Sequence, residues 1–296
     1  MSRRNVQHCL TSGCGLTLGL GTISKIERRM AAALAPALVE VTAAVPAARV
    51  VYCDETRWRE GPTKPWLWAA STVEACLFRS LDHRDRESFQ TLFGPDREGR
   101  TLISDRYSAY HSVPAVRHGY CWAHLDRDFL AVAESRAPCA FLGRYALEEV
   151  DAVFTHWHAF RAGTLDRNGL QDALAPVQAR LRAWLTWGMA AGDQKLAGFF
   201  TQVEKHWDSL WVFATTPGAE PTNNRSDRLL RAGVRWRKTS DGTQSAAGRQ
   251  FAERLLTVTG TLGLQRRSVS EFLVAAGVAA LGGGSMPRLL CPRPEP

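Results

Sequence analysis

The sequence contains no apolar run that approaches the roughly 20 residues needed to cross a bilayer. It shows no signal peptide, and its seven cysteines are odd in number and form no paired C-x-x-C motif. These absences argue against a disulfide-stabilised secreted domain and favour a reduced, cytoplasmic protein. At 296 residues and 45% hydrophobic content, the chain is long enough to bury a large core as one main domain with additions.

The charge of the chain indicates what kind of partner it binds. The formal net charge is +8, and the calculated pI is about 9.4. Between residues 220 and 267 there are ten Lys or Arg and four Asp or Glu, so a net +6 falls in one segment. Such a local excess favours a polyanionic partner, and in particular a nucleic acid.

Two acidic residues follow short apolar runs in the first half of the chain. Arg49–Asp54 and Thr101–Asp105 each read as a buried strand that ends in a carboxylate. The expected elements around them are strands at 49–54, 66–72, 75–81, 101–105 and 115–120, and helices at 84–93 and from 106. Three neighbouring strands, a helix, a strand and a helix are the order of a ribonuclease-H-like fold. Such folds place catalytic carboxylates at strand ends and on a later helix.

Residues 125–207 lack strand patterns and carry apolar residues at helical spacing, which predicts a mainly helical insertion with mostly core tryptophans. Before the first strand, a helix is expected from Thr22 or Ser24 to about residue 44. It reads either as the second half of a helix-turn-helix or as an amphipathic packing helix. The expected α/β organisation has five segments: a helical remnant at 1–45, the first part of the core at 46–121, the insertion at 122–207, core completion with a basic helical part at 208–275, and a disordered tail at 276–296.

The stretch from 220 to 238 gathers acids, amides and guanidiniums. Pro221 suits a first helical turn, and a helix that begins at Thr222 places Asn223, Asp227 and Arg231 in one row, with Asn224 and Arg228 beside them. This helix puts Asp227 in its second turn and leaves Glu220 before the cap. An ordinary surface helix could show the same charges, but the two upstream acidic motifs favour a functional site.

Cys121 and His124 form a C-x-x-H pair that could supply two zinc ligands. No second pair at ligand spacing accompanies them. We therefore expect His124 to orient a neighbour or to pack near the site rather than to bind a metal.

With these motifs in place, the chain resembles the insertion-sequence-66 family of bacterial transposases over most of residues 15 to 275. The resemblance rests on motifs that are specific only in combination. They are Asp54-Glu-Thr-x-Trp-Arg-Glu-Gly, Ser104-Asp-Arg-Tyr-Ser-Ala-Tyr, Cys121-Trp-Ala-His-Leu-x-Arg-Asp-Phe, Glu220-Pro-Thr-Asn-Asn-x-x-Asp-Arg-x-Leu-Arg, Val234-x-Trp-Arg-Lys, Gly242-Thr-Gln-Ser and Glu253-Arg-Leu-Leu-Thr-Val.

The resemblance implies a DDE transposase of ribonuclease-H-like fold, in which three carboxylates hold two divalent cations, Mg²⁺ or Mn²⁺, to cut and join DNA strands. Asp54 and Asp105 match the first two acids, and we expect their carboxylates to be close enough to share a cation. Clustered carboxylates need such cations, because a pair 4 Å apart repels by ~4 kcal/mol at an effective dielectric of 20. The implied partner is double-stranded DNA, both element ends and target, bound by a homo-oligomer in the bacterial cytoplasm at the nucleoid. The phosphate contacts are expected from Arg228, Arg231, Arg235, Arg237 and Lys238, and the supporting residues are Cys121, His124, Asn223 and Asn224.

The third acid departs from the family pattern. Where the family has Asn-Asn-x-x-Glu-Arg, this sequence has Asp227, one methylene shorter. Asp227 is the matching position, and Glu220 is its rival if the helix starts late enough to turn it inward. The resemblance also implies longer family members with an N-terminal DNA-recognition region, so we expect this chain to be a truncated or decayed copy or to have a misplaced start codon. Two alternatives therefore stay open: a truncated, catalytically impaired DNA-binding remnant, and a ribonuclease-H-like nuclease that cuts without joining ends.

Overall fold

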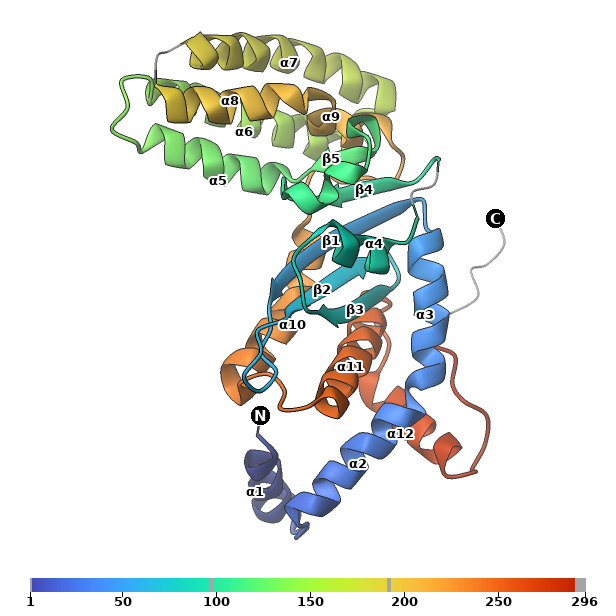
Figure 1. Cartoon of the computed structure of the whole chain (residues 1–296). Helices are drawn as coiled ribbons and strands as arrows, with labels where there is room; N and C mark the ends of the chain where they lie inside the picture. Colours follow the sequence, from blue (N-terminus) through green and yellow to red (C-terminus); the bar gives the residue numbers. More distant parts are fainter. Residues whose placement is uncertain (1, 96–97, 191–192, 291–296) are drawn as a thin grey trace. The chain divides into compact units, whose positions relative to one another are not determined.

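A computed structural model describes residues 2–95, 98–190 and 193–290 of the chain (Figure 1). The chain divides into two compact units. Unit 1 consists of Met1–Glu98 and Arg225–Pro296, and unit 2 of Gly99–Asn224. The two units are defined by contacts between residues, whereas the five segments expected above were defined by sequence patterns. The boundaries of those five segments therefore stay a prediction.

Unit 1 contains the three strands expected in the first half of the chain. They are β1 (Val50–Arg57), β2 (Trp66–Ser71) and β3 (Cys76–Leu81). β2 pairs antiparallel with both β1 and β3. In this register Asp54 lies opposite Ala69, which in turn lies opposite Phe78, so these three side chains share one face of the sheet.

That face of the sheet is covered by two helices from the far end of the sequence, α10 (Asn224–Ser240) and α11 (Ala246–Leu264). Leu230 of α10 and Leu256 of α11 are buried in one cluster with Leu67, Ala69 and Phe78 of the sheet. The opposite face contacts α3 (Ala35–Ala47) and α4 (Arg86–Phe93). The sheet is therefore enclosed on both faces, and its apolar runs are buried as strands of this kind require.

Two threonines of α11 complete the hydrogen bonding of β3. Thr257 Oγ1 accepts from Phe78 N at 2.9 Å, and Thr261 Oγ1 accepts from Cys76 N at 3.1 Å. Glu253 adds a third such contact, accepting from Ser80 N at 2.7 Å. Side chains on every fourth residue of α11 thus satisfy alternate backbone donors of β3.

The N-terminal part of unit 1 differs from the expectation in two ways. Residues 1 to 20 contain a helix, α1 (Arg3–Cys14), which Ser2 caps by accepting from Asn5 N and which ends at Gly15 in the left-handed conformation. The single helix expected to about residue 44 is two helices, α2 (Leu20–Ala33) and α3, bent by 44° at the break. Pro36 lies in the first turn of α3 and cannot donate a hydrogen bond to the end of α2, which explains the break.

Unit 2 contains β4 (Thr101–Ser104) and β5 (His118–Tyr120), which pair in parallel with Ser104 opposite Tyr120. The segment after Asp105 forms a short 3₁₀ turn, Ser108–Ser112, instead of the expected helix. The expectation was wrong because Asp105 Oδ1 accepts from Tyr107 N and forms a tight turn, while Pro114 lacks the N–H that a continuing helix would need. A second 3₁₀ turn, Ala115–Arg117, takes the place of the first half of the strand expected at 115–120.

The remainder of unit 2 is helical, as expected. Its helices are α5 (Trp122–Ala133), α6 (Phe141–Arg161), α7 (Arg167–Ala190), α8 (Gln194–Lys205) and α9 (Trp207–Thr215). Figure 1 shows α5, α6, α7 and α8 lying alongside one another. Trp157 is buried in this bundle, whereas Trp187 is 61% exposed. The expectation of core tryptophans therefore holds for the first and not for the second.

The predicted C-terminal tail is partly structured. Residues 276–280 complete α12 (Val269–Ala280), and Leu289 is buried where Arg267 donates to the carbonyls of Arg288 and Leu289. The prediction of disorder is wrong for this part, because the Arg267 guanidinium supplies the contacts that a Gly-rich segment lacks by itself. Residues 291–296 lie outside the described residues.

In the described part of the chain, no single helix is long and apolar enough to cross a membrane, although α2 and α3 together pass that test as a bent pair. The whole chain is mixed α/β, with antiparallel strands in unit 1, parallel strands in unit 2 and a large helical fraction. This is the ribonuclease-H-like class that the order of elements predicted.

Candidate active site

Asp54 is a nearly buried acid in the middle of β1, with 9% of its surface exposed. The expectation that the strand ends at Asp54 was wrong, because residues 55–57 continue the antiparallel pairing with β2. Its Oδ1 accepts from the backbone N of Glu55 at 2.8 Å. Its neighbour on the opposite face, Glu55, accepts from Arg84 Nε at 2.5 Å, and the Arg84 guanidinium lies 4.9 Å from the centre of the Trp66 ring. The two adjacent carboxylates thus have different surroundings, and Glu55 is neutralised by an arginine.

Helix α10 crosses the face of the sheet that carries Asp54. At its start, Ser226 Oγ lies 3.3 Å from Ser71 Oγ. Two turns later, an added Cβ on Gly233 would meet Leu67 at 2.4 Å, so glycine is needed for this close approach. Ser71, Ala69 and Leu67 point to the same face of β2, and Ala69 is the middle one of the three. Asp54 pairs with Ala69, so along the strands it lies between the Ser226 contact and the Gly233 contact.

Asp227 lies in the first turn of α10, on a defined flank of this helix. The sheet-facing residues are Ser226, Leu230 and Gly233, whereas Leu229 and Ala232 pack toward α11. A helix rotates by about 100° per residue, which turns Asp227 to the flank opposite the one that meets α11. Since α11 lies along β3, the Asp227 flank is the one on the β1 side of the sheet.

Asp105 follows β4 directly in unit 2 and is half-buried. Its carboxylate caps the turn at Tyr107, with Oδ1 3.0 Å from Tyr107 N. The next residue, Arg106, forms an ion pair with Asp128 of α5. Asp105 is thus held at the carboxyl end of a buried strand, as the sequence predicted.

The Cys121 motif anchors the chain just before α10. Cys121 follows β5, and its N donates to Ser104 O at the end of β4. Trp122 N donates to Pro221 O at 2.8 Å, and Asn223 N donates to Cys121 Sγ at 3.1 Å. These bonds hold residues 221–223 in a non-helical form.

The helix therefore begins at Asn224, two residues later than expected, so Asp227 lies in its first turn rather than its second. Asn223 is completely buried, whereas Asn224 is exposed. A carboxylate in the first turn is also favoured by the partial positive charge at a helix N-terminus.

Glu220 lies before α10, as predicted, and is oriented by a partner in the helical bundle. Its Oε1 is 3.6 Å from Arg161 Nη1 of α6. The rival third acid is thus engaged in an ion pair within unit 2.

The remaining candidate ligand, His124, lies in the first turn of α5, where its N donates to Cys121 O. Its Nδ1 is buried without a hydrogen-bond partner among the described residues. Across that part of the chain, no three His, Cys, Asp or Glu are grouped so that they could hold a metal ion. The pair formed by Cys121 and His124 therefore gains no further ligand.

A row of cations lies on the outer face of α10. Arg228, Arg231, Arg235 and Lys238 are all exposed and recur at intervals of three, four and three residues, opposite the sheet-facing side. None of the four forms an ion pair with another described residue. Arg237 differs, because its guanidinium donates to Arg57 O at the end of β1.

A buried histidine close to Asp105 was not predicted from the sequence. His118 in β5 is 1% exposed, and its Nε2 lies 2.7 Å from Ser104 Oγ. Burial, together with the neighbouring His111 and His206, lowers the pKa of His118 to about 3. The available signal was a histidine inside the strand expected at 115–120.

A comparison with protein families identifies the chain. The model described as Transposase IS66 family matches residues 4–251, which is most of the sequence. The chain belongs to the IS66 transposase family. A comparison with curated proteins gave no match. Membership in this family makes the chain a transposase in general terms, and the substrate of transposases is DNA.

Proposed function

We propose that this IS66 family member is a DDE transposase that cuts and joins the DNA strands of an insertion sequence at the nucleoid, with Asp54, Asp105 and Asp227 as its catalytic acids. The observation that carries the proposal is the arrangement in unit 1. Asp54 lies nearly buried on the sheet face that α10 covers, and Asp227 projects from the β1-side flank of that helix.

The donor chemistry fits a pair of Mg²⁺ or Mn²⁺ ions. All three acids offer only oxygen, which hard divalent cations prefer, and Asp54 is buried deeply enough that its charge would be costly without a counter-charge. The chemistry that two such cations supply is activation of a water or a 3′-hydroxyl and stabilisation of the departing oxygen. The proposal requires Asp105 of unit 2 to join the two acids of unit 1 in the working enzyme.

The protein groups around these acids have positioning roles. The Glu55 amide donates to Asp54 Oδ1, and the Tyr107 amide donates to Asp105 Oδ1, so a backbone hydrogen bond orients each carboxylate. The anchored segment at Cys121 fixes where α10 begins and therefore the turn on which Asp227 lies.

Asp227 is a better third acid than Glu220. Asp227 extends from the helix that packs over Asp54, whereas Glu220 pairs with Arg161 in the helical bundle. Binding metal through Glu220 would require breaking that ion pair.

The four exposed cations of α10 are the proposed DNA contacts. They are unpaired among the described residues, they follow one helix face, and they lie in the segment with the largest local charge excess. Their spacing suits successive phosphates, which give affinity without sequence preference. The Arg237 guanidinium donates to Arg57 O of β1, so we propose that Arg237 contributes less to DNA binding than the other four cations.

A second candidate function is DNA binding without catalysis. The observation in its favour is Asp227 itself, which reaches about 1.5 Å less far than the glutamate of the family pattern, whereas metal–oxygen distances tolerate only tenths of an ångström.

Strand cleavage of double-stranded DNA carrying the element ends, measured with and without Mg²⁺, separates these possibilities. Asp54→Ala and Asp105→Ala should each abolish metal-dependent cleavage while leaving DNA affinity within a few fold. Asp172→Ala, which removes an exposed acid from α7, is the matched control and should change neither. DNA binding without cleavage in the parent chain would favour the second candidate. Cleavage that survives Asp54→Ala would exclude the proposed site.

A further inference from the structure

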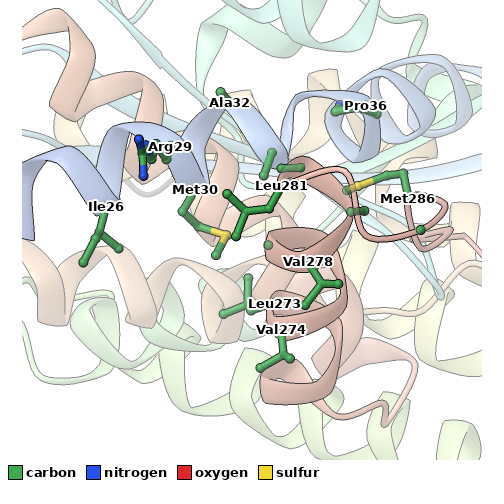
Figure 2. A pocket seen from close by; sticks show the side chains of 15 residues that line it. Ile26, Arg29, Met30, Ala32, Pro36, Leu273, Val274, Val278, Leu281 and Met286 are labelled. Carbon is green, nitrogen blue, oxygen red and sulfur yellow. The ribbon is translucent and has the colours of Figure 1, made fainter.

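Unit 1 carries an apolar groove between two helices that the transposase chemistry does not use. The groove has a volume of about 990 Å³, and its walls are formed mainly by α2 and α12. Figure 2 shows Ile26 and Met30 of α2 on one side and Val274 and Val278 of α12 on the other, with Leu281 next to Met30. Arg29 is the one charged residue in this lining.

Helix α12 is apolar on both sides, yet only one side is covered. Phe272 and Ala276 are buried against the rest of unit 1. On the outer side, Val274, Val278 and Leu281 are 66%, 47% and 80% exposed. A helix that is hydrophobic all round is normally buried all round, so the outer side is expected to be covered by something.

The outer side of α12 has the spacing of a helix-pairing seam. Glu271, Val274, Val278 and Leu281 recur at intervals of three, four and three residues, which is the pattern of facing positions in two packed helices. The pattern reads the same in both directions about position 276. Two antiparallel copies of α12 would therefore place Val274 of each opposite Val278 of the other.

The charges at the two ends of the groove complement each other in that arrangement. Glu271 begins the seam at the N-terminal end of α12. Arg29 lies on α2 beside Met30, and Figure 2 shows Met30 next to Leu281, which follows the C-terminal end of α12. Both charged side chains are exposed, and neither has an ion-pair partner in the described part of the chain. An antiparallel pairing brings Glu271 of one copy toward Arg29 of the other, twice per dimer.

We propose that this groove is the face through which two copies of the chain associate, with the two α12 helices antiparallel about a two-fold axis at the level of Ala276. The partner is a second copy because the seam and the groove that receives it lie on the same surface, which is the property of an isologous interface. The apolar lining excludes DNA as the occupant, since phosphates need cationic or polar partners.

Sedimentation of the full chain without DNA tests the proposal, with Val278→Glu as the disrupting change. This substitution puts a carboxylate in the centre of the seam at a position that is half exposed in the single copy, so the fold should survive, as circular dichroism would show. Dimer dissociation should become at least tenfold easier, because a charge would be buried without a partner. Val39→Glu is the matched control, since Val39 is 69% exposed on α3 outside the groove, and it should leave the dimer unchanged.

A charge exchange tests the pairing itself. Arg29→Glu and Glu271→Arg should each weaken association, and the double variant should restore it, because the two opposite charges are exchanged across the interface. A monomeric parent chain at tens of micromolar, a dimer unaffected by Val278→Glu, or a double variant no better than the single ones would overturn the proposal. Vesicle binding or a foreign protein that requires the same residues in a monomeric chain would overturn it as well. These measurements use no DNA and no metal, so they stand or fall separately from the catalytic proposal.

Discussion

The two units of this transposase differ sharply in charge. Unit 1 has 25 Lys and Arg against 16 Asp and Glu, a net +9, whereas unit 2 has 12 against 13, a net −1. The whole positive excess of the chain, +8, therefore belongs to the unit that holds Asp54, Asp227 and the cationic face of α10. Unit 2 contributes Asp105, two parallel strands and an aromatic helical bundle.

The difference in charge assigns the attraction of DNA to one unit, which the pI of the whole chain does not reveal. Long-range attraction of DNA is expected from unit 1, where unpaired cations follow one helix. In unit 2, arginines form ion pairs with acids of the same unit, such as Arg180 with Glu149 and Arg161 with Glu220. A nearly neutral unit is not expected to attract DNA over long distances, so in the proposed enzyme the contribution of Asp105 is positional.

The largest expected effect is at the third acid. Asp227→Ala should abolish Mg²⁺-dependent strand cleavage, a loss of more than about 100-fold, as expected for removal of a metal ligand. Asp227→Glu should raise cleavage above the parent, because the longer side chain restores the reach of the family pattern. The measurement is the cleavage rate at saturating DNA.

Glu220→Ala is the control for the third acid and should change cleavage little, since Glu220 pairs with Arg161. If Glu220→Ala stops cleavage and Asp227→Ala does not, the roles of the two residues are reversed and the catalytic acids are split differently between the units.

The next effect concerns DNA affinity and tests the charge contrast directly. Changing Arg228, Arg231, Arg235 and Lys238 to Ala should reduce the slope of log affinity against log salt concentration by about one per residue. The measurement is a binding titration at several salt concentrations.

The matched set in unit 2 is Arg127, Arg136 and Arg144, all exposed. Their change to Ala should leave the slope nearly unaltered. Equal effects from the two sets would show that attraction is spread over the whole chain rather than held in unit 1.

A smaller effect distinguishes the units by pH. Because the pKa of His118 is lowered to about 3 in the folded state, the unfolded chain binds a proton that folded unit 2 does not, between about pH 6.5 and about pH 3. The stability that neutral His118 contributes is present above pH 6.5 and is lost toward pH 3, at up to about 1.4 kcal/mol per pH unit. Glu253 in unit 1 acts in the opposite sense, because burial raises its pKa and acidification relieves the cost of its buried charge.

Hydrogen exchange read peptide by peptide between pH 7 and pH 5 should therefore show protection falling first in unit 2. His118→Gln, which keeps a hydrogen-bond partner for Ser104, should flatten that loss. A pH response that is the same in both units would mean that His118 is not its source.

The smallest effect tests the packing of unit 1. Thr257→Val keeps the shape of the side chain but leaves Phe78 N without its acceptor, which should lower the free energy of unfolding by about 1–3 kcal/mol. Thr259→Val is the control, because its hydroxyl bonds only to Leu255 and Leu256 of its own helix, and it should change stability by less than about 0.5 kcal/mol. Urea unfolding measures both.

The sequence predicted those parts of the fold that depend on local pattern. Apolar runs ending in an acid located β1 and β4, and helical spacing located most of the bundle. The errors lie where a distant contact decides the local structure. α10 begins late because Cys121, about a hundred residues earlier, binds Asn223, and the start of the helix at Asn224 could not be read from its own capping residues.

The same limit applies to the candidate site. Alternation along a strand gives the face on which Asp54 lies, but the helix that covers this face is set by the close approach of Gly233 to Leu67. The pairing of Glu220 with Arg161 was equally invisible, because no recognisable pattern links these two residues along the helical insertion. The left-handed Gly15 and the capping Ser2 of α1, by contrast, were local signals that the sequence did contain.

The exposed thiols of the described chain are confined to α1, which makes this helix a natural site for chemical labelling. Of the described cysteines, Cys9 and Cys14 are exposed and both belong to α1, whereas Cys53, Cys76, Cys121 and Cys139 are buried. Burial also raises the pKa of Cys76 to about 12, so it has almost no thiolate at neutral pH. In a Cys291→Ser background, a maleimide fluorophore or spin label would therefore attach to the N-terminal helix of the folded chain, and its mobility would report on that helix without any engineered cysteine.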